Sequence, residues 1–308
     1  MQKEVKMPPK ISIIIPVFNV EQYIAECLES CIHQTLKEIE ILIVDDCGSD
    51  RSIEIAREYA SRDSRIKILE QEENFGPFHC RNVGAKEAKA DYIMFLDSDD
   101  FLDLNACEVA LSATENNFYD IVGFGAFGYC KDKVHILVAR KEQKFDSFKA
   151  YRDWACVQKY TPQWELTFRI IKKEKYLKAC AILNLQDRIY MAEDALMSFV
   201  LWNVCKTFCH KKEILYYYRR DNMASTTHSN NVDLLLSDYK KVMDKISEIS
   251  KLNSFDKKLA KLFVSMLRWE SNHLKNKHHR INKIFFYFYR RAFTIKRSLR
   301  YRKRFKGL

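Results

Sequence analysis

The chain has 308 residues, of which 47% are hydrophobic and 30% charged, with seven glycines and five prolines. This composition is typical of a folded globular protein of one large or two modest domains, and it excludes collagen-like, disordered and Pro-rich chains. Residues 275–308 hold thirteen Lys or Arg and no Asp or Glu, whereas residues 1–274 hold 39 basic and 41 acidic side chains. The net charge of +11 therefore belongs to a basic tail on a nearly neutral body.

No apolar stretch is long enough to span a bilayer, and the N-terminal sequence MQKEVKMPPK lacks the apolar core of a signal peptide. We therefore expect a cytoplasmic location. The ten cysteines include no Cys-x-x-Cys pair. They are interpreted as reduced core residues rather than as disulfides or a zinc site.

Strands and helices alternate over the first 130 residues. Ile11–Val17 is an apolar, β-branched run typical of a buried parallel strand. Further strands are predicted at residues 39–44, 65–69, 92–96 and 120–127; helices are predicted at 20–34, from the caps Ser49 or Asp50 to about 60, at 77–90 and at 104–116. The alternation predicts an α/β fold with a mostly parallel sheet flanked by helices.

The remainder of the chain is less regular at first and then helical. Residues 164–171 and 213–219 are predicted to be strands, and residues 193–203 a helix. After about residue 230 the pattern is helical throughout.

Acidic residues follow two of the predicted parallel strands. Asp45 and Asp46 end the second strand, Asp97 and Asp99 follow the fourth, and Asn19 follows the first. Such residues can simply start loops and cap helices. Two clusters on neighbouring strands instead favour a ligand site, because open α/β sheets bind ligands beyond the carboxyl ends of their strands.

Asp97 and Asp99 occupy alternate positions in the sequence FLDSDD. Two carboxylates placed in this way can bind a hard divalent cation that also contacts phosphates. Such a cation would act as a Lewis acid and stabilise a departing diphosphate.

The sequence resembles the inverting glycosyltransferases of family 2 with a GT-A fold. The resemblance rests on residues 11–19 (ISIIIPVFN), 30–35 (SCIHQT), 43–50 (IVDDCGSD), 74–76 (NFG), 81–82 (RN), 95–100 (FLDSDD) and 192–194 (AED), which follow the family's order and spacing. The pattern is most similar to small hexosyltransferases of bacterial surface glycans, among them lipooligosaccharide β-1,3-galactosyltransferases. The chain departs from the family at Cys47, where Gly or Asn is usual.

The resemblance implies a role for individual residues on the donor side. The nucleotide-sugar would be bound by Pro16, Val17, Phe18, Asn19, Asp45, Asp46, Arg81, Asp97 and Ser98. Among these, Asp46, with Asp45 beside it, would hydrogen-bond the uracil, and Arg81 would contact the base or the diphosphate. Asp99 would be the direct ligand of Mn²⁺ or Mg²⁺, with Asp97 near the ribose and the metal.

Glu193 and Asp194 would supply the general base, with Asp194 as first choice. The alternative is an acidic first turn that complements a helix dipole. Arg219, Ser225 and His228 are tentative diphosphate contacts, and a solvated basic loop is the alternative for them.

The implied reaction transfers a hexose from a UDP-sugar donor to a hydroxyl of a glycan or glycolipid acceptor. Galactose is the first choice, with glucose and N-acetylhexosamines open. A GT-A domain would span residues 1–228, with a nucleotide-sugar half at about 10–130 and an acceptor half at about 130–228. Residues 229–308 would form a helical extension. A phosphotransferase built on the FLDSDDF aspartates is the alternative enzyme, and a tail-driven adaptor is the alternative of another class.

The tail at residues 280–306 combines an aromatic and aliphatic stripe at helical spacing with many cations. This pattern favours peripheral contact with an anionic membrane, here the inner face of the cell membrane. The stripe could instead pack on the body or form a homo-oligomer. Nucleic acid, which basic clusters can also bind, is not the expected partner.

Overall fold

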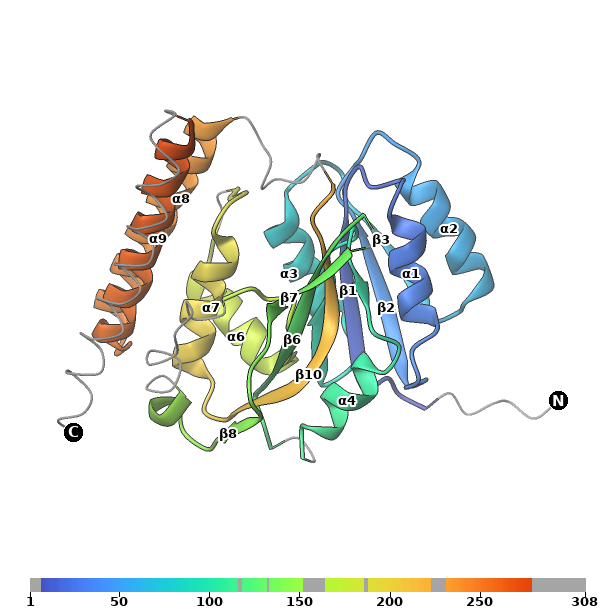
Figure 1. Cartoon of the computed structure of the whole chain (residues 1–308), viewed down its shortest axis with the longest axis horizontal. Coiled ribbons are helices and arrows are strands. Elements are labelled where there is room, and N and C mark those ends of the chain that lie inside the picture. Colours follow the sequence, from blue (N-terminus) through green and yellow to red (C-terminus); the bar gives the residue numbers. More distant parts are fainter. Residues whose placement is uncertain are drawn as a thin grey trace.

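The computed structural model describes residues 7–115, 118–131, 133–151, 164–185, 188–222 and 231–278. The strands are β1 (Ile11–Val17), β2 (Ile39–Asp45), β3 (Ile66–Glu70), β4 (Tyr92–Phe95), β5 (Phe101–Leu102), β6 (Ile121–Cys130), β7 (Lys133–Val138), β8 (Gln143–Phe145), β9 (Arg169–Lys172) and β10 (Phe208–Arg219). The helices are α1 (Ile24–Ile32), α2 (Ser52–Arg62), α3 (Pro77–Glu87), α4 (Ala106–Ser112), α6 (Lys173–Leu183), α7 (Glu193–Val204), α8 (Val232–Leu252) and α9 (Lys257–His278). They form one sheet between helical layers (Figure 1).

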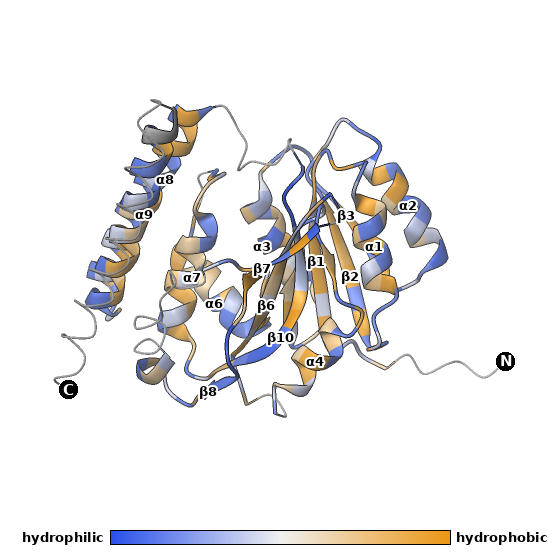
Figure 2. Cartoon of the chain, viewed as in Figure 1, coloured by the Kyte–Doolittle hydropathy of each residue, from blue (hydrophilic) through white to orange (hydrophobic). Residues whose placement is uncertain are grey.

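The first half of the sheet is parallel, as predicted. The strands run in the order β3-β2-β1-β4, and each is hydrogen-bonded in parallel to its neighbour. Side chains of β1 alternate between two cores, with Ile14 packed among residues of α3, α6 and α7, and Ile13 among residues of α1, α2 and α4. Apolar residues line the central strands accordingly (Figure 2). The α/β prediction is therefore confirmed.

The second half makes the sheet mixed. β9 lies antiparallel between β4 and β6, and β5, β7 and β8 also pair antiparallel with their neighbours. The predicted strand at 164–171 is wrong in extent, because only Arg169–Lys172 pairs. Leu166 and Phe168 are buried, which makes the run look like a strand. The Leu166 N–H, however, donates to the Asp194 carboxylate instead of to another strand.

The cysteines agree with the core interpretation. Within the described ranges all nine cysteines are free thiols, and six of them are buried.

The helix predicted at 104–116 is shorter in the structure, where it spans Ala106–Ser112.

α8 and α9 pack against α7 rather than standing apart from the sheet domain (Figure 1). The ring of Phe263 lies 5.4 Å from that of Trp202 and 5.7 Å from that of Phe199, both on α7. The Asp256 N–H also donates to the Asn203 side chain at 2.9 Å. The helical prediction after residue 230 is confirmed up to 278, and the predicted basic tail at 280–306 lies outside the described residues. Among the described helices, none combines the length and apolarity needed to cross a membrane.

The close approach of α3 to β1 depends on Gly84, which has no side chain. A Cβ atom on Gly84 would lie 2.4 Å from Cγ2 of Ile14, which is fully buried in the sheet. Gly84 follows Arg81 by three residues, so both lie on the same side of α3. The glycine thus sets how closely α3 brings Arg81 to the ends of the strands.

We predict that Gly84→Ala lowers the free energy of unfolding by about 1–3 kcal/mol, because the added methyl group overpacks the contact with Ile14. Urea denaturation of the two proteins measures this. Lys86→Ala, at an exposed position of the same helix, is the control and should change stability by less than about 0.5 kcal/mol. Equal midpoints for wild type and Gly84→Ala would show that α3 does not depend on this contact.

Candidate active site

A cavity of about 940 Å³ lies at the carboxyl ends of β1 and β4. Its walls come from the end of β1, the start of α3, the residues after β4, residues 136–140 at the end of β7, the loop 164–168, the turn into α7, the end of β10, and single side chains of α8 and α9. Carboxyl ends of parallel strands are where an open α/β sheet binds ligands. The sequence-predicted site therefore coincides with a real cavity.

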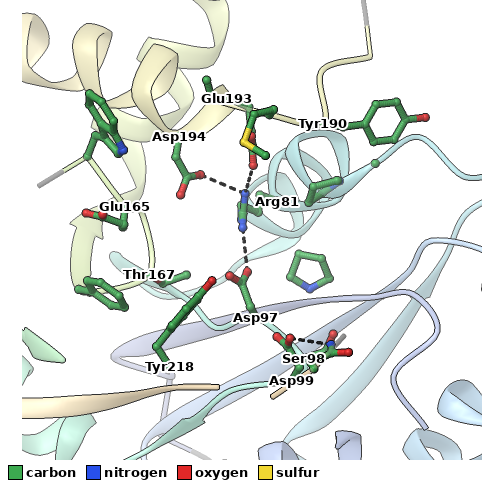
Figure 3. A pocket seen from close by; sticks show the side chains of 18 of the residues that line it. Arg81, Asp97, Ser98, Asp99, Glu165, Thr167, Tyr190, Glu193, Asp194 and Tyr218 are labelled. Atoms are coloured by element: carbon green, nitrogen blue, oxygen red, sulfur yellow. Dashed lines mark hydrogen bonds and ion pairs between the residues drawn. The ribbon is translucent and has the colours of Figure 1, made fainter. Parts of the chain in front are cut away.

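Arg81 lies at the centre of this cavity wall and joins its two sides (Figure 3). Its Nη2 atom is 2.8 Å from Oδ1 of Asp97, at the end of β4. Its Nη1 atom is 3.1 Å from Oε1 of Glu193 and 3.1 Å from Oδ1 of Asp194, both in the first turn of α7. The side chain is only 4% exposed. A buried cation in contact with three carboxylates fixes elements that are more than 90 residues apart in sequence.

The two carboxylates of α7 differ in their surroundings. The Glu193 side chain is 11% exposed, and burial together with the charge of Asp194 raises its pKa to about 8. The Asp194 side chain is 23% exposed and its Oδ2 accepts the Leu166 N–H at 3.2 Å. Burial raises the pKa of Asp194, and the charge of Arg81 opposes that rise. Near neutral pH Glu193 therefore tends to hold a proton, and Asp194 is the group better placed to accept one.

The chain enters α7 through a left-handed residue. Ala192 has φ +68°, a region that costs a residue other than glycine about 1 kcal/mol. Such a conformation at the edge of a cavity turns the chain sharply just before the two acids.

Asp97, Asp99 and Asp100 have separate functions in the fold. Asp100 is fully buried and accepts hydrogen bonds from the Tyr216 hydroxyl at 2.6 Å and from the Arg219 N–H at 2.7 Å, so it fixes the strand end. Asp99 lines the cavity and accepts from Asn222 at 2.8 Å. Burial and the charge of Asp97 raise its pKa.

The pair of Asp97 and Asp99 suits a divalent cation in the chemistry of its donors. Both side chains line the cavity, and their mutual repulsion is a cost that a cation would relieve. Within the described ranges no cluster of three or more His, Cys, Asp or Glu residues could hold a metal. Mg²⁺ commonly uses one or two carboxylates and takes its other ligands from water and substrate phosphates. The residues present therefore fit Mn²⁺ or Mg²⁺ that is bound together with a diphosphate.

The predicted nucleotide side is assembled from the ends of β1 and β2. Pro16, Val17, Phe18 and Asn19 all line the cavity, as does Ser98. Asp46 lines it too, and its carboxylate accepts the backbone N–H groups of Phe75 and Gly76 at 2.8 Å and 3.1 Å. Asp46 thus also holds the loop that precedes α3.

Some predicted contacts lie elsewhere. Asp45 is not among the cavity's lining residues, and its Oδ1 accepts the Cys47 N–H at 2.9 Å. Arg219 is not among the lining residues either; it pairs with Glu26 and donates to the Asp99 carbonyl at 2.7 Å. Ser225 and His228 lie outside the described residues. The contacts of Arg81 are with carboxylates, although the resemblance implied the base or the diphosphate.

Several lining residues carry no function in the sequence-based prediction. Among them are Asn74, Thr167, Tyr190, Tyr218, Asn222, Tyr239 and Glu270. The NFG motif could have indicated Asn74, and the position of Tyr190 just before Glu193 and Asp194 could have indicated that residue. Tyr239 and Glu270 carry no such signal, because they lie within amphipathic helices whose pattern reports only which face is buried.

We predict that Arg81→Met destabilises the fold by about 3–5 kcal/mol at pH 8, because three carboxylates lose their buried counter-charge. Burial already raises the pKa values of Glu193 and Asp194, and without the guanidinium these rise further, so the folded state binds more protons than the unfolded one. The loss should therefore grow as pH rises from 5.5 to 8. Urea denaturation at the two pH values tests this.

Arg57→Met is the matched control, because it removes a guanidinium from an exposed pair with Glu70. It should cost less than about 1 kcal/mol at either pH. An Arg81→Met protein whose stability loss is the same at both pH values would contradict the proposed role of Arg81 as counter-charge.

Comparison with known proteins agrees with this geometry. The model of the family described as "Glycosyl transferase family 2" matches residues 12–175, more than half of the chain. The uncharacterized glycosyltransferase EpsJ of Bacillus subtilis (strain 168) is 43% identical over 127 residues, which are 41% of this chain and 37% of EpsJ. The putative glycosyltransferase EpsH of the same organism is 31% identical over 217 residues, 68% of this chain and 61% of EpsH. The matches thus span less than two thirds of these relatives.

The first 349 residues of S. aureus TarS, crystallised with UDP-GlcNAc, superpose with a TM-score of 0.66 at 20% identity, covering 84% of this chain and 71% of that one. At this identity the likeness shows a common fold, which is the GT-A fold. None of these three proteins is named as a lipooligosaccharide galactosyltransferase. The chain has a GT-A fold with a mixed central sheet and C-terminal helices, and it belongs to glycosyltransferase family 2.

Proposed function

We propose that the chain transfers a hexose from a UDP-sugar to a hydroxyl of a bacterial surface glycan or glycolipid, with inversion at the anomeric carbon. The proposal rests on the ion pairs of Arg81. Arg81 holds Asp97, on the donor side of the cavity, and Asp194, on α7, within one set of ion pairs. A carboxylate suited to a metal–diphosphate and a carboxylate suited to proton transfer therefore face the same space (Figure 3).

The donor is proposed to lie along the ends of β1 and β2. Pro16 to Asn19 and Asp46 would bind the nucleoside, and the TarS structure with UDP-GlcNAc supports a UDP-sugar. Asp99 and Asp97 would hold Mn²⁺ or Mg²⁺. A cation bound there supplies positive charge to a departing diphosphate.

Asp194 is proposed as the base. It would take the proton of the acceptor hydroxyl while that oxygen forms its bond to the anomeric carbon and the bond from that carbon to the diphosphate oxygen breaks. Arg81 would keep Asp194 ionised and oriented, because their contact favours the charged carboxylate. Glu193, whose pKa is raised to about 8, is less suited to accept a proton near neutral pH.

We predict that Asp194→Asn lowers sugar transfer by about 10²–10⁴-fold while UDP binding changes little, because only proton transfer is lost. Glu193→Gln should cost about tenfold or less, since a protonated Glu193 already resembles the amide. UDP release during transfer measures the first effect and calorimetric titration with UDP the second. Glu174→Gln, on the exposed start of α6, is the control. A larger loss in Glu193→Gln than in Asp194→Asn would reverse the assignment.

We predict that UDP release from one member of a UDP-sugar panel requires Mn²⁺ or Mg²⁺ and that Asp99→Asn abolishes the metal dependence, with a loss of about 10²-fold or more. Slow hydrolysis without acceptor suffices for this measurement. Asp91→Asn, which removes an exposed carboxylate beside the start of β4, is the control. No release from any UDP-sugar, together with no thermal stabilisation by UDP and Mn²⁺, would refute the donor site.

Galactose is the first donor sugar proposed, and lipooligosaccharide the first acceptor, on the resemblance of the sequence motifs. Glucose and N-acetylhexosamines are the alternatives. Residues 280–306, outside the described part, are proposed to contact an anionic membrane at the inner face of the cell membrane. A tail-driven adaptor would instead lose function on deletion of 275–308 and keep it in the Asp99 and Asp194 variants.

A further inference from the structure

We propose that α8 and α9 complete the acceptor end of the cavity, and that the acceptor unit bound there is an uncharged sugar recognised through its hydroxyl groups. The inference rests on the proposed glycosyl transfer and names the substrate class for its second half. It concerns Trp164, Glu165, Tyr239 and Glu270, which line the cavity on the side of α7.

The two C-terminal helices contribute a polar pair to the cavity. The hydroxyl of Tyr239 on α8 donates to Oε2 of Glu270 on α9 at 3.1 Å, and both residues line the cavity. The ring of Tyr239 is 7% exposed. Burial raises the pKa of Glu270 to about 7. A buried tyrosine–carboxyl pair at a cavity wall can accept and donate hydrogen bonds to a bound hydroxyl group.

A second contact fixes this pair relative to the proposed base. Asp238, the neighbour of Tyr239, is fully buried and its Oδ2 accepts the N–H of Tyr190 at 2.8 Å. Tyr190 lies in the segment that leads through Ala192 into Glu193 and Asp194. α8 therefore places Tyr239 at the cavity, and it also holds the turn that carries the proposed base.

The same side of the cavity contains a buried polar atom that lacks a hydrogen-bond partner. Oε2 of Glu165 is buried and has no hydrogen-bond partner among the described residues, although the residue lines the cavity. A buried carboxyl oxygen without a donor is costly, so a ligand hydroxyl is a fitting partner. Trp164 lies next to it in the wall, and an aromatic ring suits the apolar face of a sugar ring.

The charges at this end argue for a neutral ligand. Glu165, Glu193, Asp194 and Glu270 supply four carboxyl groups from the described residues. The described cations of the cavity are Arg81, which already contacts three carboxylates, and Arg140, whose charge already acts on Glu165 and lowers the pKa of that carboxyl against the effect of its burial. A phosphate or uronate would be desolvated beside these acids, whereas each carboxyl oxygen can accept from a sugar hydroxyl.

The test compares methyl β-D-galactoside with its 6-phosphate as probes for wild-type protein saturated with UDP and Mn²⁺. Saturation-transfer NMR titrations give the two dissociation constants. We expect the neutral probe to bind at least about tenfold more tightly than the phosphate. With the titrations run at pH 8, Glu165→Gln and Glu270→Gln should each reduce this preference by about threefold or more, because each removes a carboxyl group that can ionise. Tyr239→Phe should weaken the neutral probe without altering the preference as strongly.

Glu248→Gln is the control, because it removes an exposed carboxylate from the same helix as Tyr239 and should leave the preference unchanged. Calorimetric titration with UDP reports on the donor half separately. If UDP fails to bind, the proposed function itself fails. If UDP binds but the phosphate probe binds as tightly as the neutral one, or neither probe binds, the acceptor inference is overturned and the donor site stands. The wild-type comparison alone decides this if a variant does not fold.

Discussion

The architecture of the cavity depends on one buried guanidinium. A cation taken out of water is costly unless it is paired, and Arg81 is paired with carboxylates from the end of β4 and from the first turn of α7. Those acids in turn would repel one another without it. The arrangement is therefore stable only when α3, β4 and α7 meet at this point, and this meeting brings the strand ends and the first turn of α7 together around one cavity.

Local features of the chain place Arg81 and its partners at the cavity. Gly84 lets α3 approach Ile14 of β1, so that Arg81 reaches the strand ends. The left-handed Ala192 begins α7 with its two acids at the cavity, and the Leu166 N–H holds Asp194 from the opposite side. α8 and α9 pack on α7, and Asp238 of α8 accepts the Tyr190 N–H. The C-terminal helices therefore belong to the site physically, although the family model matches only residues 12–175.

The sequence predicts the parallel half of the fold well because β1 and β2 are buried on both faces and are therefore continuously apolar. It predicts the other half less completely. The predicted strands at 120–127 and 213–219 and the predicted helix at 193–203 correspond to β6, β10 and α7, whereas β7, β8 and α6 have no counterpart in the prediction. β9 is a short strand placed by tertiary pairing between β4 and β6. The acids Asp97, Asp99 and Asp194 could be found from motifs. Motifs do not show that Arg81 contacts these acids, that Arg219 pairs with Glu26, or that Tyr239 and Glu270 line the cavity. Each of these contacts depends on distant segments that meet only in the folded chain.

In the proposed reaction, one cavity places a proton-accepting carboxylate opposite the diphosphate of a UDP-sugar, so that the anomeric carbon is attacked once and from the far side. The most direct measurement is proton NMR of the sugar first released from a UDP-α-hexose by the protein with Mn²⁺, before mutarotation mixes the anomers. A single displacement predicts that the β-anomer appears first. Initial release of the α-anomer would contradict the account, because it requires two displacements or attack from the same face.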